Sequence, residues 1–188
     1  MRLLRPALPA IVAFALALLA PAQTPRALAV NYMPGWNLVS GPEGSHLAGA
    51  EGAIYTLQPG DTDYEAFPAD APLRGGYGYW AYFPRGGWLE AAAGTPGYSV
   101  ALLPGQWTLV GNPSAESVMT LSGAVAALVY VPGDGYVSVS VIPPGVGAWV
   151  LGDGPLTLSP PEWQPAVPVA LATPALPPVP PLPRQRAR

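Results

Sequence analysis

Cysteine is absent from the sequence. Without thiols the chain cannot form disulfides, use a cysteine nucleophile or hold a metal through sulfur. Many small exported domains rely on disulfides because their cores are small. Any folded domain in this chain must therefore be held together by apolar packing alone.

Basic side chains are also scarce. Lysine is absent, and between residues 30 and 159 only Arg74 and Arg85 are basic, against ten carboxylates, which gives this segment a net charge of −8. A protein that binds a phosphate backbone needs clustered Lys and Arg to release counterions. The composition therefore argues against nucleic acid as a partner of the folded part, and it disfavours anionic membrane surfaces.

Histidine occurs once, as His46, in a glycine-rich stretch. A Ser-His-Asp triad would have to use this residue, and the sequence has no G-x-S-x-G motif to present a serine. A histidine-based metal site would need further histidines, and a phosphate-binding glycine loop is missing as well. We therefore predict a non-catalytic protein without a cofactor, in which His46 lies in a surface loop.

The N-terminal 29 residues have the composition of an export signal. Arg2 and Arg5 form a positive start, and residues 11–20 (IVAFALALLA) follow as an apolar stretch too short to span a membrane. Small residues then offer cleavage after Ala22 or Ala29. The pattern predicts a signal peptide over residues 1–29, a secreted or cell-envelope location, and no transmembrane segment in the mature chain.

Residues 30–159 contain two copies of one sequence unit, repeat 1 at about 32–91 and repeat 2 at about 102–158. Three landmarks recur in the same order, roughly 70 residues apart. They are residues 34–42 (PGWNLVSGP) and 104–113 (PGQWTLVGNP), 59–61 (PGD) and 132–134 (PGD), and 76–80 (GYGYW) and 145–149 (GVGAW). Landmarks shared in this way predict that the two copies fold alike.

Short runs of aromatic and β-branched residues between Gly and Pro turns predict an all-β fold. The run YVSVSVI at 136–142 alternates with the period of a half-buried strand. We expect the repeats to form, as pseudo-symmetric halves, one antiparallel β-barrel or sandwich; two small tandem barrels are the alternative. Little helix is expected, at most a turn or two within residues 115–125 with Ser114 as N-cap. The expected strands are 36–40, 53–58, 77–83, 98–102, 107–110, 126–131, 136–142 and 147–151.

Four tryptophans occupy equivalent positions in the two repeats. Flat indole rings can stack on sugars, but positions kept in both copies while their neighbours differ are typical of shared packing. We therefore assign these tryptophans to the core. Gly78 and Gly147 each precede one of them by two residues, and we expect these glycines to leave room for an indole from a neighbouring strand. The four residues are Trp36, Trp80, Trp107 and Trp149.

Aromatic residues that differ between the repeats are candidates for binding. The strand with Trp80 carries Tyr77 and Tyr79 on its other face, where repeat 2 has Val146 and Ala148. These two tyrosines are candidate ligand-binding residues, and ordinary half-exposed strand aromatics are the alternative. Further candidates for the same surface are Tyr64, Tyr82 and Trp88.

Alternating carboxylates form a second candidate site. Asp61, Asp63 and Glu65 are spaced as calcium ligands can be in an exposed turn, because Ca²⁺ takes several oxygen ligands. The stretch lacks the glycine that an EF-hand has after its third ligand, and repeat 2 keeps only Asp134 of the group. A solvated acidic hairpin is the alternative to a calcium site.

Proline dominates the C-terminal tail, with 10 of the 29 residues 160–188. This composition predicts an extended polyproline II segment rather than helix or sheet. The tail ends with Arg184, Arg186 and Arg188, opposite in sign to the acidic domain. It can serve as a docking ligand or as a stalk, and a passive disordered terminus is the alternative.

The paired motifs PGWNLVSGP with GYGYW, and PGQWTLVGNP with GVGAW, resemble a β-rich module of exported and cell-surface bacterial proteins that has a GWNL…P start and a GYW strand. The resemblance implies an exported β domain and no particular activity. We therefore expect a non-catalytic module with a structural or binding role at the cell surface or in the extracellular space. Its partner would be an envelope polysaccharide or another surface protein. The alternative is a carbohydrate-binding module that uses the repeat 1 aromatics.

Overall fold

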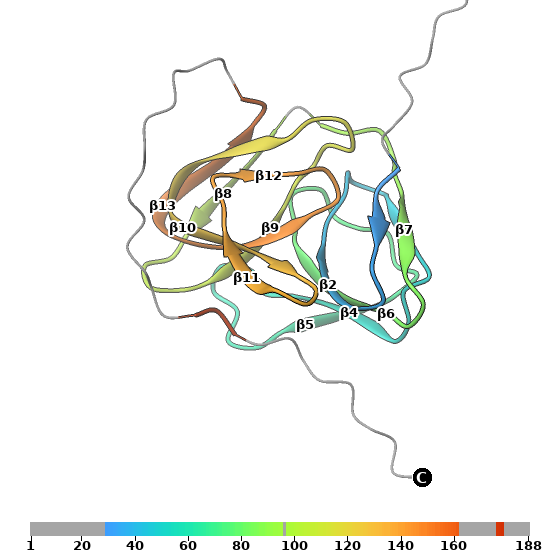
Figure 1. The fold of residues 1–188 in the computed structure, drawn as a ribbon. Coiled ribbons are helices and arrows are strands. Elements are labelled where there is room, and N and C mark those ends of the chain that lie inside the picture. Colours follow the sequence, from blue (N-terminus) through green and yellow to red (C-terminus); the bar gives the residue numbers. More distant parts are fainter. Residues whose placement is uncertain (1–28, 96, 162–175, 179–188) are drawn as a thin grey trace, which may run out of the picture.

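Strands, turns and loops make up the described part of the chain. The computed structural model describes residues 29–95, 97–161 and 176–178, and no helix occurs among them. The strands form three sheets with antiparallel pairing (Figure 1). The all-β prediction is therefore confirmed. The expected signal peptide, apart from Ala29, and most of the proline-rich tail lie outside the described residues.

The first half of the domain contains two of the three sheets. Its strands are short because turns with positive-φ glycines follow one another closely, as at Gly60, where φ is +93°. The four-stranded sheet has the order β2 (Gly35–Val39), β6 (Tyr79–Phe83), β4 (Ala53–Thr56), β5 (Glu65–Pro68). The three-stranded sheet has the order β1 (Asn31–Tyr32), β7 (Gly87–Glu90), β3 (His46–Ala48).

The second half forms one six-stranded sheet around two long strands. The main path is β11 (Gly135–Ser138), β10 (Met119–Val131), β13 (Gly147–Ser159), β8 (Tyr98–Leu102). Two more strands join it, β12 (Val141–Ile142) on β10 and β9 (Thr108–Gly111) on β13. The predicted strand 136–142 is thus divided between β11 and β12.

The two long strands change partners along their length. The register of β10 against β13 shifts between Ser122 and Ala126, where Gly123 has a φ of +95°. Residues 147–150 of β13, before this irregularity, pair with β9, and residues 154–158, after it, pair with β8. This half therefore contains the strand orders β9-β13-β10-β11 and β8-β13-β10.

Two features that the sequence allowed, the barrel form of the architecture and a short helix, are absent from the described residues. The sheets do not close into a barrel, since β2 and β5 at the ends of the four-stranded sheet each pair with one neighbouring strand, whereas closure requires the end strands to pair. The expected helix within 115–125 is also absent, because β10 begins at Met119 and pairs with β12 and β13 there. Ser114 nevertheless accepts hydrogen bonds from the backbone N–H groups of Glu116 and Ser117, at 3.1 Å each. It caps a turn rather than a helix.

Three apolar clusters make up the core. One consists of first-half residues between Tyr32 and Leu89, and one of second-half residues between Leu102 and Leu158. The third draws on both halves and contains Trp80 and Trp149. Each half therefore has a cluster of its own, and the halves are also joined by a common one. Neither a single undivided core nor two separate barrels describes this arrangement.

The tryptophans common to both repeats lie in the third cluster. Trp80 and Trp149 are fully buried, Trp107 is nearly so, and Trp36 packs against the cluster while half-buried. The assignment to the core is confirmed for Trp80, Trp107 and Trp149, whereas Trp36 lies at the edge of the cluster. The expected role of the preceding glycines is wrong: a Cβ on Gly78 would collide with the backbone carbonyl of Val110, not with an indole.

Candidate functional site

Tyr77 and Tyr79 do not form an exposed pair. Tyr79 is 2% exposed, and the backbone N–H of Arg74 donates to its hydroxyl at 3.1 Å. Tyr77 is half-buried, stacks on Tyr79 with ring centroids 6.3 Å apart, and has the Arg74 guanidinium 5.7 Å from its ring centroid. Burial raises the pKa of Tyr79 to about 12, with a smaller opposing effect of the Arg74 contacts. Tyr79 is therefore a core residue, and its ring is not available to a ligand.

Tyr82 and Tyr64 lie on the other side of the four-stranded sheet, in the aromatic network around the shared cluster. Tyr82 packs edge-on against Trp36 at 5.5 Å, and Tyr64 packs against Trp149 at 6.3 Å. Both tyrosines are half-buried. Burial raises the pKa of Tyr64, and a contact with the Trp80 indole opposes that shift in part. The five predicted aromatics are therefore not gathered at one surface.

Trp88 is the most exposed of the predicted aromatics. Its side chain is 52% exposed on β7, opposite Asn31 on one side and Ala48 on the other. It lines a hollow of about 440 Å³ together with the charged residues Glu51 and Arg85. An accessible indole beside a carboxylate and a guanidinium combines a flat apolar face with hydrogen-bonding groups, which suits a neutral polar ligand such as a sugar.

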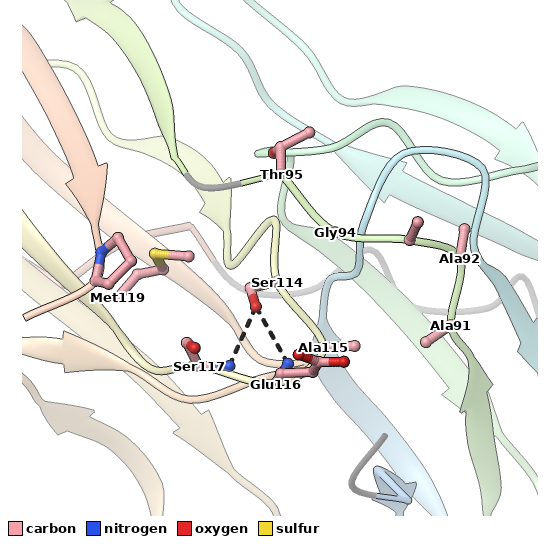
Figure 2. A pocket seen from close by; sticks show the side chains of 11 residues that line it. Ala91, Ala92, Gly94, Thr95, Ser114, Ala115, Glu116, Ser117 and Met119 are labelled. Carbon is pink, nitrogen blue, oxygen red and sulfur yellow. Dashed lines mark hydrogen bonds between the residues drawn. The ribbon is translucent and has the colours of Figure 1, made fainter. Parts of the chain in front are cut away.

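A second hollow of about 440 Å³ lies between the link after β7 and the turn before β10 (Figure 2). Ala92, Gly94 and Thr95 line one side, and Ser114 and Glu116 the other. The Ser114 hydroxyl points to the backbone of its own turn, where it accepts two hydrogen bonds. The lining is therefore mostly of small side chains, and its ionisable group is the Glu116 carboxylate. Sequence reasoning did not find this hollow, because it treated Ser114 as the cap of a helix.

The alternating acids are not gathered as ligands of one ion. Asp61 accepts a hydrogen bond from the backbone N–H of Gln58 at 2.7 Å, and Asp63 one from the Thr62 hydroxyl at 3.4 Å. Among the described residues, no group of three or more His, Cys, Asp or Glu side chains lies close enough to hold a metal ion. The calcium hypothesis for Asp61, Asp63 and Glu65 therefore has no support in the geometry.

His46 lies at the start of β3 and is exposed. A ring nitrogen, Nδ1, lies 3.1 Å from the backbone carbonyl oxygen of Asp70, and a bond there requires the tautomer protonated at Nδ1. The interaction ties β3 to the loop after β5. This contact gives the His46 imidazole a structural role, which is to hold that loop against the strand.

A group of aromatics around Tyr136 was not singled out from the sequence as a surface. Tyr136 on β11 is the partner of Tyr130 on β10, with ring centroids 5.7 Å apart. Trp80 of the first half approaches both rings, at 5.0 Å from Tyr130 and 6.5 Å from Tyr136. Burial raises the pKa of Tyr136, and a contact with the Trp149 indole partly opposes this. The sequence signal for this group was that a tyrosine follows each PGD turn, Tyr64 in repeat 1 and Tyr136 in repeat 2.

Comparison with protein-family models, curated proteins and solved structures finds no match to this chain. Within the described ranges, no helix has the length and apolar character needed to cross a membrane.

Proposed function

We propose that the chain is an exported, non-catalytic β module that binds a partner at the cell surface or in the extracellular space. We further propose that its domain is a duplicated unit of two pseudo-symmetric repeats, related to the GWNL…P/GYW modules. The single observation that carries the binding role is the exposed Trp88 indole beside Glu51 and Arg85. A large indole left about half-exposed contributes less to packing than a buried one, so its surface is free for a ligand.

Strand registers support the duplication. Leu38 pairs with Trp80 across β2 and β6, and Leu109 pairs with Trp149 across β9 and β13. These are the residues that the sequence alignment of the repeats makes equivalent. Two isolated β-bridges join the halves, one between Val39 and Val146 and the other between Tyr77 and Val110. The bridges are reciprocal, because the alignment of the repeats makes Val39 equivalent to Val110 and Tyr77 equivalent to Val146.

Export is tested by expressing the full chain in a bacterial host and measuring the mass of the product found outside the cytoplasm. We expect a chain shortened to begin after Ala22 or Ala29, as the sequence predicts. A full-length product confined to the cytoplasm would overturn the exported location. A variant with Arg2 and Arg5 replaced by Glu serves as the control that should not be exported.

Carbohydrate binding is the second candidate function, and the Trp88 hollow favours it. The purified mature protein is tested on a glycan array beside Trp88→Ala, with Met33→Ala as the control because Met33 is 63% exposed and outside the hollow. We expect Trp88→Ala to lose binding at unchanged melting temperature and Met33→Ala to keep it. Absence of glycan binding by the unmodified protein would remove this candidate and leave a surface protein as the partner to seek.

A further inference from the structure

A short piece of the proline-rich tail lies against the domain. Residues 176–178 (Leu-Pro-Pro) are drawn in dark red below β11 in Figure 1. Pro177 is buried, whereas Leu176 is 72% exposed. The Tyr136 hydroxyl donates a hydrogen bond to the backbone carbonyl of Pro178 at 3.0 Å. The contact joins residues 42 positions apart in the chain.

The contact has the chemistry of polyproline recognition. A polyproline II segment has no internal hydrogen bonds, so its carbonyl groups are free to accept from a partner. Proteins that bind such segments present aromatic side chains in a groove, where proline rings pack and a donor reaches a carbonyl. Tyr136 combines both features, since its ring belongs to the cluster with Tyr130 and Trp80 while its hydroxyl reaches Pro178.

The tail is long enough to reach this surface from its own domain. Fourteen residues, 162–175, connect Pro161 to Leu176. A fully extended chain reaches about 3.3 Å per residue, so a connection of this length can span at most roughly 45 Å. A domain of the present size has a radius of gyration of about 14 Å. Intramolecular docking is therefore sterically accessible.

Charge favours the same pairing. The tail sequence ends with three arginines, Arg184, Arg186 and Arg188, and the segment 30–159 carries a net charge of −8. Opposite charges draw the tail toward the domain at low ionic strength, and salt screens this attraction over about 10 Å at 0.1 M. This attraction raises the fraction of molecules in which a weak specific contact between tail and domain is formed.

We propose that the surface around Tyr136 and Tyr130 is a docking site for polyproline II segments, and that this chain's own Leu176-Pro177-Pro178 occupies it intramolecularly. The tail then acts as a resident competitor that any proline-rich ligand from outside must displace. This inference is independent of export and of the Trp88 hollow.

The test titrates a synthetic peptide of residues 173–188 into the full chain and into its Pro177→Asp variant, by calorimetry. A tethered segment has an effective concentration of about 1 mM, so a site with a Kd of about 0.1 mM is roughly 90% occupied by its own tail. We therefore expect the Pro177→Asp variant to bind the peptide roughly tenfold more tightly than the unmodified chain. Pro177 lies outside the strands, so this change leaves the folded domain intact.

A second pair of variants tests the hydroxyl. Tyr136→Phe in the Pro177→Asp background keeps the ring and removes the donor, and we expect peptide affinity to fall roughly five- to tenfold. Tyr82→Phe, a half-buried tyrosine on β6, is the matched control and should leave the affinity unchanged. Melting temperatures of all variants are measured beside the titrations, and backbone amide shifts of β11 on peptide addition report binding without relying on heat.

Three outcomes would overturn the proposal. Equal peptide affinity for the unmodified chain and Pro177→Asp would show a site that the tail does not fill. No binding and no β11 shift in Pro177→Asp would show that there is no such site. Concentration-dependent association of the unmodified chain, abolished by Pro177→Asp, would show that the tail of a second copy is the occupant.

Discussion

Gly78 and Gly147 lie against each other where the two halves of the domain meet. A Cβ atom placed on Gly147 would lie 3.2 Å from the Cα of Gly78 and 2.7 Å from the carbonyl oxygen of Val39. Neither glycine has a left-handed φ, so lack of space, not backbone conformation, requires glycine here. The pair allows the backbones of the halves to approach closely enough for the bridges Val39–Val146 and Tyr77–Val110.

Gly147→Ala should destabilise the domain by about 1–3 kcal/mol, the usual cost of overpacking a tight contact. The free energy of unfolding from urea titration measures the effect. Gly94→Ala is the control and should cost less, because Gly94 is exposed, also lacks a left-handed φ, and has its nearest atom 3.2 Å from the added Cβ, against 2.7 Å at Gly147. Equal unfolding midpoints for Gly147→Ala and the unmodified protein would contradict the close approach of the halves.

Trp80→Ala and Trp149→Ala should each lower stability by about 3–5 kcal/mol, since both side chains are fully buried between the halves. Thermal melting followed by circular dichroism measures the loss. Trp88→Ala is the matched control: its indole is 52% exposed, and the melting temperature should stay close to that of the unmodified protein. Wild-type-like melting of either buried variant would refute the role of the shared cluster.

Asn112→Ala should cost about 2–3 kcal/mol, because it removes three hydrogen bonds from a fully buried side chain. The amide donates to the carbonyls of Ser117 and Ile142 at 2.8 and 2.9 Å, and it accepts from the N–H of Ser114 at 2.8 Å. The measurement is the urea midpoint. Asn31→Ala, which removes one exposed hydrogen bond, should shift that midpoint little, and a similar loss for both variants would argue against the buried network.

Stability should fall as the pH rises above about 10. Burial raises the pKa of Tyr79 and of Tyr98 to about 12, the latter with a contribution from Tyr77. Between pH 10 and 12 the unfolded chain releases tyrosine protons that the folded chain retains, so the free energy of unfolding decreases with pH. Below pH 10 this contribution is fully present.

Urea unfolding at about pH 8 and pH 11 measures this dependence. Tyr98→Phe removes one of the ionising groups and should show a smaller difference between the two conditions. A stability that stays constant or increases over the same interval would contradict the burial of these phenols.

Several sequence predictions depended on patterns whose physical cause is local, and these agree with the structure. Turns with Pro-Gly and short runs of aromatic and β-branched residues indicated an all-β fold, and the landmarks at Trp80 and Trp149 indicated buried tryptophans. The helix expected within 115–125 failed for a tertiary reason. Its residues Thr120 and Leu121 pair with Ser159 and Leu158, and those ladder bonds are worth more to the segment than a short helix would be.

The candidate site was less predictable than the fold. Periodicity placed Tyr77 and Tyr79 on one face of a strand, but it did not say whether another element covers that face. In the structure the first-half cluster covers Tyr79, whereas Trp88 on a different sheet remains exposed. Exposure depends on contacts between segments far apart in the sequence, such as those that bring Val39, Tyr79 and Leu89 into one cluster.

The sequence by itself determined the strand-forming class of the domain, its acidity and its reliance on apolar packing, because composition and turn chemistry act locally. Only the tertiary structure decided that Gly78 and Gly147 meet, that the sheets stay open, and that Tyr136 reaches Pro178. Each of these depends on where segments dozens of residues apart come together. For the two glycines, the close approach goes with the burial of Trp80 and Trp149 in the cluster that the halves share.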